Sequence, residues 1–506
     1  METILTISLL LSSFILFLLI KKRNRSLLAQ NLPPGPIKLP LIGNLHLIGQ
    51  LPFRSFRALS TRHGPIMHLT LGEVRAFVVS SPGLAKRVLT DGDPGFTDRP
   101  ESIAFEIMWY NYTSISFSLY GDYWRQMRKI CMIELLSAKN VRSFVSIRAD
   151  EVARMVESIR ASARKPVNLT EMAFTLTSGV TCRAAFGKVC KDRDGLVGLL
   201  RAAFKMAGGL EIADLYPTRR VIRALSWSRM KLVEMRRKVD VILDDIIREH
   251  KETAGKGGVR RGNGEFGNED LVDVFLRVME GGELDIPIGN NNIKAVLLDL
   301  FAAGTETSSI VIDWTMVELM RNPRVMAKAQ AEIRQAFQKD QTIEEQDLTH
   351  KLKYLKLVIK ESLRLHPPIP IIPRLSREEC VLDGYTIPAK SRVLVNNWAM
   401  QRDPKYWKDP ESFVPDRFED GGLDFMNEGL QYLPFGMGKR MCPGMAFGLA
   451  SIELPLARLL YSFDWKLPEG VRAEDLDMTE NPGVTASRKD KLFLVAIPYE
   501  PSIRLL

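Results

Sequence analysis

The sequence predicts a mainly α-helical fold with small β-sheets, of the α+β class. Apolar residues recur with helical periodicity over long stretches, and the β-rich runs are short. Strands and helices do not alternate as in a βαβ chain, and no glycine-rich nucleotide fingerprint lies between a strand and a helix. The predicted helices cover residues 143–162, 225–253, 293–321, 325–338 and 354–365, and the predicted strands cover 66–71, 76–79, 391–397 and 492–497.

Composition indicates one large body rather than several domains. The chain has 506 residues, 45% of them hydrophobic, which is ample for a buried core. The composition is even after the first 31 residues, except at residues 251–270, where glycines and charges predict a flexible surface loop between two helices. The net charge is +10, but no basic stripe with interleaved aromatic residues stands out, so we expect no nucleic-acid partner.

The N-terminal residues predict a membrane anchor. Residues 3–20 carry no charge and approach the length of about 20 residues that a membrane-spanning helix needs. The start Met1-Glu2 is acidic, and the basic cluster at residues 21–25 follows the apolar run, which favours a retained anchor over a cleaved signal peptide. We expect a single-pass anchor at 1–23 in the lipid bilayer, with the body in the cytosol.

The anchor is followed by a stiff segment and then by the catalytic body. Residues 24–44 are basic and rich in proline, which restricts φ, so we expect a rigid hinge; an ordinary linker is the alternative. Residues 45–506 form the expected globular domain. The five cysteines are scattered and odd in number, which favours a reducing compartment over a disulfide framework.

Three polar patterns have helical spacing or interrupt a predicted helix. Trp124 and Arg128 are four residues apart and share a face, as do Glu361 and Arg364 at a spacing of three. The run Ala303-Gly304-Thr305-Glu306-Thr307-Ser308 interrupts the long apolar helix at 293–321, where polar residues need a reason. The structural alternative for the run is a threonine that bonds back to the preceding helical turn.

The most specific pattern is the cysteine loop between Pro434 and Gly448. Gly436, Gly438 and Gly444 permit tight turns and close approach of the backbone to a planar group. Pro443 suits a helix start, which would place the Cys442 thiolate at a helix N-terminus, where the dipole and free amides lower its pKa. Arg440 is placed to reach an anionic cofactor edge.

This loop resembles the haem-binding loop of cytochromes P450, Phe-x-x-Gly-x-Arg-x-Cys-x-Gly, at every fixed position. The other patterns occur in the order typical of that family. The resemblance implies haem b as cofactor and Cys442 as its iron ligand. It implies the cofactor-binding residues Arg440, Trp124, Arg128 and Arg374, which contact the haem propionates, and Phe435. It also implies a buried structural triad of Glu361, Arg364 and Arg417, and an acid–alcohol pair, Glu306 and Thr307, that delivers protons during O₂ activation.

The implied function is a haem-thiolate monooxygenase that inserts one oxygen atom of O₂ into a small apolar plant metabolite. No flavin or nicotinamide fingerprint is visible, so electrons from NADPH would arrive through a separate P450 reductase. The chain resembles plant A-type enzymes of the endoplasmic reticulum membrane, and within them terpenoid oxidases of the premnaspirodiene-oxygenase kind that act on sesqui- or diterpenoids. The predicted substrate pocket contains Ile369, Ile371, Ile372, Val484, Ala302 and Ala303, although plain core packing is the alternative for each of them.

Other functions compete with this one. Related enzymes oxidise alkaloids or phenolics, so hydroxylation of such a substrate is an alternative within the same class. A reductase-independent P450 isomerase or dehydratase, or a haem protein without catalysis, is an alternative of another class. Glu306, Thr307 and the uninterrupted cysteine loop favour the monooxygenase.

Overall fold

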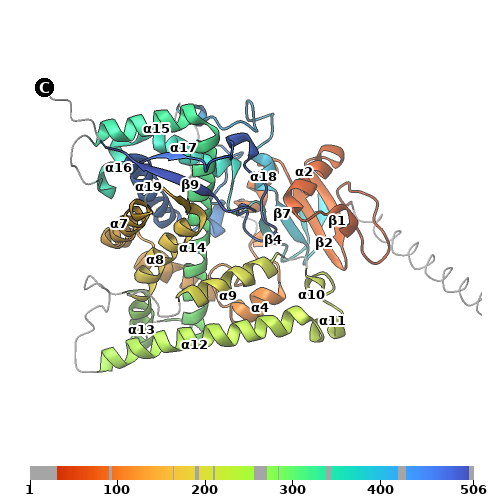
Figure 1. Ribbon diagram of the computed structural model, residues 1–506. Helices are drawn as coiled ribbons and strands as arrows, with labels where there is room; N and C mark the ends of the chain where they lie inside the picture. The colour runs from red at the N-terminus through yellow and green to blue at the C-terminus, as the bar shows by residue number, and fades with distance from the viewer. Residues whose placement is uncertain are drawn as a thin grey trace, which may run out of the picture.

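The computed structural model describes residues 31–90, 94–162, 164–187, 193–208, 211–255, 270–282, 284–337, 343–419 and 429–500. The predicted anchor at 1–23 and the beginning of the hinge lie outside the described residues. Helices dominate the body, and the strands form small sheets near its margins, so the predicted α+β class is confirmed (Figure 1).

The helices and strands have the following bounds. The α-helices are α2 (Pro52–His63), α3 (Pro82–Leu89), α4 (Ile103–Met108), α5 (Asp122–Ile130), α6 (Ala138–Ser143), α7 (Val145–Ala161), α8 (Leu169–Phe186), α9 (Arg193–Met206), α10 (Ile212–Leu215), α11 (Arg220–Ala224), α12 (Trp227–Gly255), α13 (Leu271–Gly281), α14 (Asn290–Arg321), α15 (Pro323–Ala336), α16 (Glu345–Lys351), α17 (Lys353–Leu365), α18 (Asn397–Met400) and α19 (Met445–Ser462). The strands are β1 (Ile66–Leu71), β2 (Val74–Val79), β3 (Pro166–Asn168), β4 (Ile372–Leu375), β5 (Cys380–Leu382), β6 (Tyr385–Ile387), β7 (Arg392–Val395), β8 (Phe463–Lys466) and β9 (Phe493–Pro498).

The five predicted helices correspond to α7, α12, α14, α15 and α17, and the four predicted strands correspond to β1, β2, β7 and β9. The predicted loop at 251–270 needs correction at both ends. Helix α12 continues to Gly255. Asp270 is buried because it caps α13, where it accepts a bond from the Asp273 amide at 3.0 Å, and because it bonds His250 at 2.9 Å. Residues 256–269 lie outside the described part of the chain.

The largest sheet has the strand order β1-β2-β7-β4 and lies at one end of the molecule beside α2 and α18 (Figure 1). Strands β1 and β2 form an antiparallel hairpin, β2 pairs in parallel with β7, and β7 pairs antiparallel with β4. The parallel pair brings a strand from the first hundred residues beside one that begins at Arg392. This sheet therefore ties the N-terminal part of the body to the segment that follows α17.

Helix α14 forms the centre of the body. It packs against α8, α19 and α17, and most of its residues between Ile293 and Leu319 are buried (Figure 1). Among the described residues it is the one helix long and apolar enough to cross a membrane, but 72% of its most apolar window is buried in the protein. Its apolar character is therefore that of a core helix.

Candidate active site

The cysteine loop has the backbone geometry that its glycines predict. Gly436 and Gly438 have φ values of 70° and 73°, in the left-handed region that favours glycine. A Cβ atom on Gly438 would also collide with the carbonyl oxygen of Leu89. The Cys442 amide donates to the Phe435 carbonyl at 2.9 Å, which closes the loop. The glycine conformations and this hydrogen bond together restrict the position of the Cys442 thiol.

The helix after the cysteine begins two residues later than predicted. Pro443 precedes it, Gly444 is its N-cap and Met445 its first residue. The thiol still adjoins the first turn, because the Gly444 amide donates to it. Burial raises the pKa of the Cys442 thiol, while the Gly444 amide and the Arg128 charge act in the opposite direction.

Two features indicate a hollow between the cysteine loop and α14. Cys442 is exposed by its surface area although protein atoms surround and desolvate it, as expected of a side chain that borders an internal space. On α14, Ala303 is likewise exposed, whereas Phe301 and Ala302 beside it are buried. Helix α19 packs on α14 near Gly304, so we infer that Cys442 and Ala303 border the same hollow.

Four arginines gather beside this hollow. Burial lowers the pKa of Arg440 to about 9 and that of Arg99 to about 10, and each cation repels the next. The pKa of Arg374 is also lowered well below its usual value, by burial and then by the charges of Arg99 and Arg440. Arg128 acts on Arg99 and Arg440 in the same way. The cluster thus concentrates positive charge that an anionic group would relieve.

Haem b, a flat group with two carboxylates, fits these residues. The fit rests on the surface of Cys442 that borders the hollow, on the cation excess, and on the Arg440 Nη1 atom, which is buried without a hydrogen-bond partner among the described residues. The Trp124 indole N–H donates to the Ile115 carbonyl at 2.9 Å. The Trp124 ring lies under Arg440 and Arg128, at 4.6 Å and 5.3 Å from the ring centroid.

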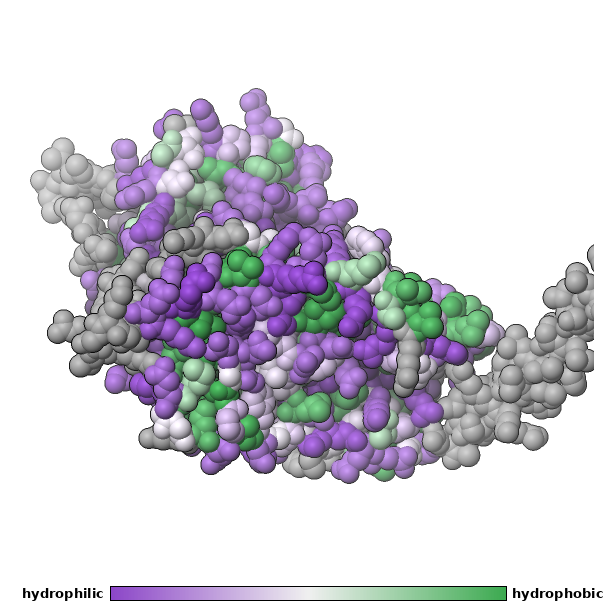
Figure 2. Space-filling model, turned by 90° about the horizontal axis from the view of Figure 1, so that it is seen from below, coloured by the Kyte–Doolittle hydropathy of each residue, from purple (hydrophilic) through white to green (hydrophobic). Residues whose placement is uncertain are grey.

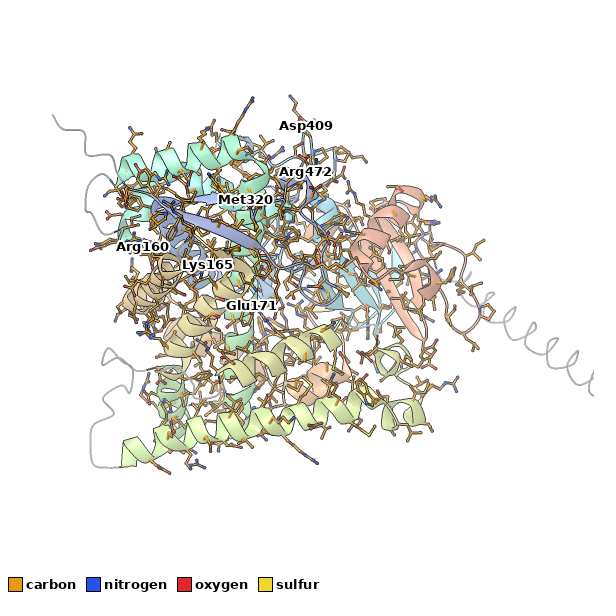
Figure 3. The ribbon with its side chains drawn as sticks, viewed as in Figure 1. Arg160, Lys165, Glu171, Met320, Asp409 and Arg472 are labelled. Atoms are coloured by element: carbon orange, nitrogen blue, oxygen red, sulfur yellow. The ribbon has the colours of Figure 1, made fainter. Side chains whose placement is uncertain are left out.

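Glu306 and Thr307 are adjacent in the chain but bond different partners. The Thr307 hydroxyl donates to the Ala303 carbonyl at 2.6 Å, the backbone bond named above as the structural alternative. The Glu306 carboxylate accepts from Thr485 at 2.8 Å. Burial raises the pKa of Glu306, and the Thr485 bond and the Arg201 charge oppose that rise. The Arg201 guanidinium lies 3.4 Å from the Glu171 carboxylate. Glu171, on the first turn of α8, is labelled in Figure 3.

Glu361, Arg364 and Arg417 meet in a buried ion triad. Arg364 donates twice to Glu361, at 2.7 Å and 2.8 Å, and Arg417 donates at 3.0 Å. The remaining donors of Arg364 reach the carbonyls of Gln401, Pro410 and Ser412. The triad therefore joins α17 to residues 415–418 and to the segment that precedes them.

The predicted pocket residues do not all share one place. Ala302 and Val484 pack with the large apolar cluster around α14. Ile372 is in the core of the four-stranded sheet, and Ile371 packs against the clusters on α2 and α18. Strand alternation explains the split, because neighbouring residues of a strand face opposite sides. Ile371 and Ile372 thus have the packing of core residues; Ile369 is partly buried just before β4.

An aromatic wall lies near the hollow and comes from residues 102–119, a segment whose position in the sequence predicts a substrate wall. The rings of Phe105 and Phe117 stack with centroids 3.6 Å apart, and the Trp109 ring meets Phe117 edge-on at 5.2 Å. Phe105 and Phe117 are partly buried against the apolar cluster that contains Phe301. The segment was predicted from its position, but its rings stand in no spaced motif and were not singled out one by one. Arg99 also stands in no motif, and no sequence signal identified it.

Comparisons with known proteins agree with this geometry. The family model for cytochrome P450 matches residues 33–494. The chain is 53% identical over 498 residues to premnaspirodiene oxygenase of Hyoscyamus muticus, covering 98% of each chain. It is 51% identical over 500 residues to 5-epiaristolochene 1,3-dihydroxylase of Nicotiana tabacum, again covering 98% of each. It is also 50% identical over 488 residues to cytochrome P450 71D13 of Mentha piperita, covering 96% of each. A family match across nearly the whole body, with relatives named as oxygenases and hydroxylases, establishes that the chain belongs to the cytochrome P450 family and is a P450 monooxygenase.

Proposed function

We propose that this monooxygenase is a haem-thiolate enzyme that inserts one oxygen atom of O₂ into a sesqui- or diterpenoid of plant specialised metabolism. The observation that carries the proposal is the Cys442 thiol, which borders a hollow closed by α14 and lies beside four arginines. Bound haem would supply the activation of O₂, with the thiolate promoting O–O cleavage.

Each of these residues has a distinct task. Cys442 ligates the iron, and the Gly444 amide donates to its sulfur and so tunes the ligand. Arg440 and Arg374, with Arg128 and Arg99 nearby, neutralise the cofactor carboxylates. Phe435 shapes the loop, because its carbonyl receives the Cys442 amide. The triad on α17 keeps this side of the fold together.

We assign Thr307 and Glu306 of α14 to the delivery of protons during O₂ activation. The Thr307 hydroxyl lies one turn from the exposed Ala303, so its oxygen lone pairs remain able to accept a bond from a water in the hollow. Burial raises the pKa of Glu306 above its usual value, which favours the protonated form and suits a carboxyl group that donates a proton. Glu306 accepts from Thr485, and the Thr307 hydroxyl donates to the Ala303 carbonyl, so we expect a water to connect the two side chains.

The substrate class follows from the wall and the relatives. Phe105, Phe117 and Val484 offer an apolar surface beside α14, suited to a hydrocarbon skeleton. Two of the relatives are named for oxidising premnaspirodiene and 5-epiaristolochene. Their identity to this chain along almost its whole length favours a terpenoid over an alkaloid or phenolic.

The proposal also includes the source of electrons and the cellular location of the enzyme. We expect NADPH to supply electrons through a separate P450 reductase, and residues 1–23 to anchor the enzyme in the endoplasmic reticulum membrane with its body in the cytosol. Exposed apolar residues on two segments support a bilayer contact: Ile37, Leu39 and Leu41 on one, and Ile212, Val221, Leu225 and Trp227 on the other. The Tyr216 hydroxyl joins the segments through the Leu41 carbonyl at 3.3 Å. Figure 2 shows hydrophobic residues on this face toward the end that carries β1 and β2.

The test is turnover in microsomes that contain the full chain and a P450 reductase. The reactions are supplied with NADPH and with a panel of sesquiterpenes, diterpenes, indole alkaloids and phenolics, and products are identified by mass spectrometry. The proposal expects a hydroxylated terpenoid that requires both NADPH and the reductase. Product from the alkaloid or phenolic arm alone would refute the substrate class, and product without reductase would refute the electron route.

A further inference from the structure

A short segment, residues 114–118, which we name the strap, lies between α4 and α5 and beside the site. It has no regular secondary structure, and Ser114, Ile115 and Ser118 within it are buried. Buried backbone outside a helix or sheet needs other hydrogen-bond partners. The hydrogen-bond partners of the strap are side chains that lie outside it in the sequence.

Three of these partners are donors that hold strap carbonyls. Trp124 donates to the Ile115 carbonyl at 2.9 Å. Arg99 donates to the Ser116 carbonyl at 3.2 Å, and Arg440 donates to the Ser118 carbonyl at 2.6 Å. Arg99 and Arg440 belong to the arginine cluster proposed for the cofactor carboxylates, and the Trp124 ring lies under Arg440, so the strap is held by the residues that border the cofactor site.

The fourth partner is a carboxylate from α14. Asp299 accepts the Ser116 amide at 2.8 Å, and the hydroxyls of Ser114 and Ser116 also donate to it. Asp299 is 5% exposed, and burial of a charged carboxylate is costly unless hydrogen bonds offset the loss of water. Its bonds to the strap provide this offset. It lies one helical turn before Ala303, on the helix that closes the hollow.

The strap carries Phe117, whose ring stacks on Phe105 and meets the edge of Trp109. Any shift of the Ser116 amide moves the neighbouring Phe117 directly. We infer that Asp299 is a positioning residue that sets substrate specificity, because it fixes the strap to α14 and thereby the place of the Phe117 ring in the aromatic wall. The inference rests on the proposed oxidation of an apolar substrate at this site.

The experiment measures ligand binding to the haem-loaded enzyme by absorbance titration with two probes. Imidazole is too small to span the site, whereas 1-phenylimidazole adds a ring that reports on the aromatic wall. The measured quantity is the ratio of the two dissociation constants in wild type, Asp299→Ala, Asp299→Asn and Phe117→Leu. Asp313→Ala is the matched control, because Asp313 is another buried carboxylate of α14 and bonds Thr170 instead.

Asp299→Ala should weaken 1-phenylimidazole relative to imidazole by roughly threefold to tenfold, the loss expected for one aromatic contact. Phe117→Leu should change the ratio in the same direction, Asp299→Asn should recover most of the loss through its remaining acceptor oxygen, and Asp313→Ala should leave the ratio unchanged. Haem content should stay at the wild-type level in the two Asp299 variants and in Phe117→Leu.

An unchanged ratio in both Asp299 variants would overturn the inference, as would an equal loss of both probes. If Asp299→Ala fails to fold, the other two variants decide. An unchanged ratio in Phe117→Leu would contradict a place for that ring in the wall, and an Asp299→Asn ratio that falls as far as the Phe117→Leu ratio would contradict the recovery expected through the acceptor oxygen. Failure of wild type itself to bind imidazole at its haem would count against the proposed function as well, so the two failures are distinguishable.

Discussion

Two buried clusters of charge in this protein are built in opposite ways. In the triad of Glu361, Arg364 and Arg417, carboxylate and guanidinium groups bond each other directly and Arg364 also reaches three carbonyls. In the arginine cluster of Arg99, Arg128, Arg374 and Arg440, burial and the neighbouring cations lower the pKa values of Arg99, Arg374 and Arg440 although Asp299 and Asp98 oppose this at Arg99 and Arg440, and Arg440 keeps one buried nitrogen without a partner in the described chain. The first cluster is complete within the protein, and the second needs an anion from outside it.

The difference separates a structural role from a binding role. A fully bonded buried cluster holds elements together, and loss of one member leaves the others unpaired. A cluster that lowers the pKa values of its own members stores unfavourable repulsion that a dianionic ligand relieves. Substitutions in the two places should therefore affect different properties.

The largest effect is expected from Glu361→Gln. The substitution leaves two buried arginines without a counter-charge, at a cost of about 3–5 kcal/mol. The yield of folded, haem-loaded protein and its thermal midpoint should both fall sharply. Glu234→Gln is the control, because Glu234 pairs with Lys238 on an exposed helix face, and it should change neither quantity. A normal thermal midpoint in Glu361→Gln would remove the structural role of the triad.

Thr307→Ala tests whether polar groups at the hollow act in the chemistry. A positioned proton-transfer group typically contributes about 10²–10⁴-fold in rate. We expect NADPH consumption to continue while product falls and hydrogen peroxide rises, with haem content unchanged. Thr315→Ala is the control on the same helix, since Thr315 makes the same bond to the preceding turn, at 2.6 Å, but is fully buried. It should lower the thermal midpoint and leave coupling intact; the reverse pattern would contradict the assignment.

A smaller effect is expected from Arg374→Met in the arginine cluster. The hydrogen bond that the structure gives Arg374 goes to the adjacent Pro373 carbonyl, so little of the fold depends on it. A charged hydrogen bond to the cofactor is worth about 1.5–3 kcal/mol, so haem should transfer to an excess of an apo haem protein at least roughly tenfold faster. The thermal midpoint of the haem-free protein should not fall. A large fall in the thermal midpoint of haem-free Arg374→Met would instead give Arg374 a structural role like that of the triad.

The smallest effect concerns the pH dependence of stability through Asp299. Burial raises the pKa of Asp299 from 3.8 to about 6 in the folded protein. The folded state therefore binds the proton more tightly than the unfolded state, and the cost of the buried charge is relieved as pH falls through about 6 toward 4. Between about pH 7.5 and about pH 5, wild type should gain roughly 1–1.5 kcal/mol relative to Asp299→Asn. The measurement is the thermal midpoint of each protein at these two pH values. A wild-type midpoint that falls relative to that of Asp299→Asn at the lower pH would contradict the sign.

The sequence predicted the long helices and the cysteine loop because both carry strong local signals. The periodicity of α14 and the ten-residue loop motif are visible without tertiary information. Strand β4 escaped prediction, since Pro373 interrupts a run of only four residues. The bond between Thr485 and Glu306 joins residues 179 positions apart, so no spacing rule could suggest it. Arg99 was identified as a site residue only from the fold, whereas Phe117 lies in the segment 102–119, whose place in the wall the sequence position predicted without naming the ring.

The central claim is that Cys442 is the thiolate ligand of a haem, and the spectrum of the reduced, CO-bound protein tests it most directly. Wild type and Cys380→Ser, a control at another buried cysteine, should give the thiolate-type CO spectrum. Cys442→Ser should lose that spectrum and all turnover. A Cys442→Ser protein that keeps the thiolate-type spectrum would contradict the account.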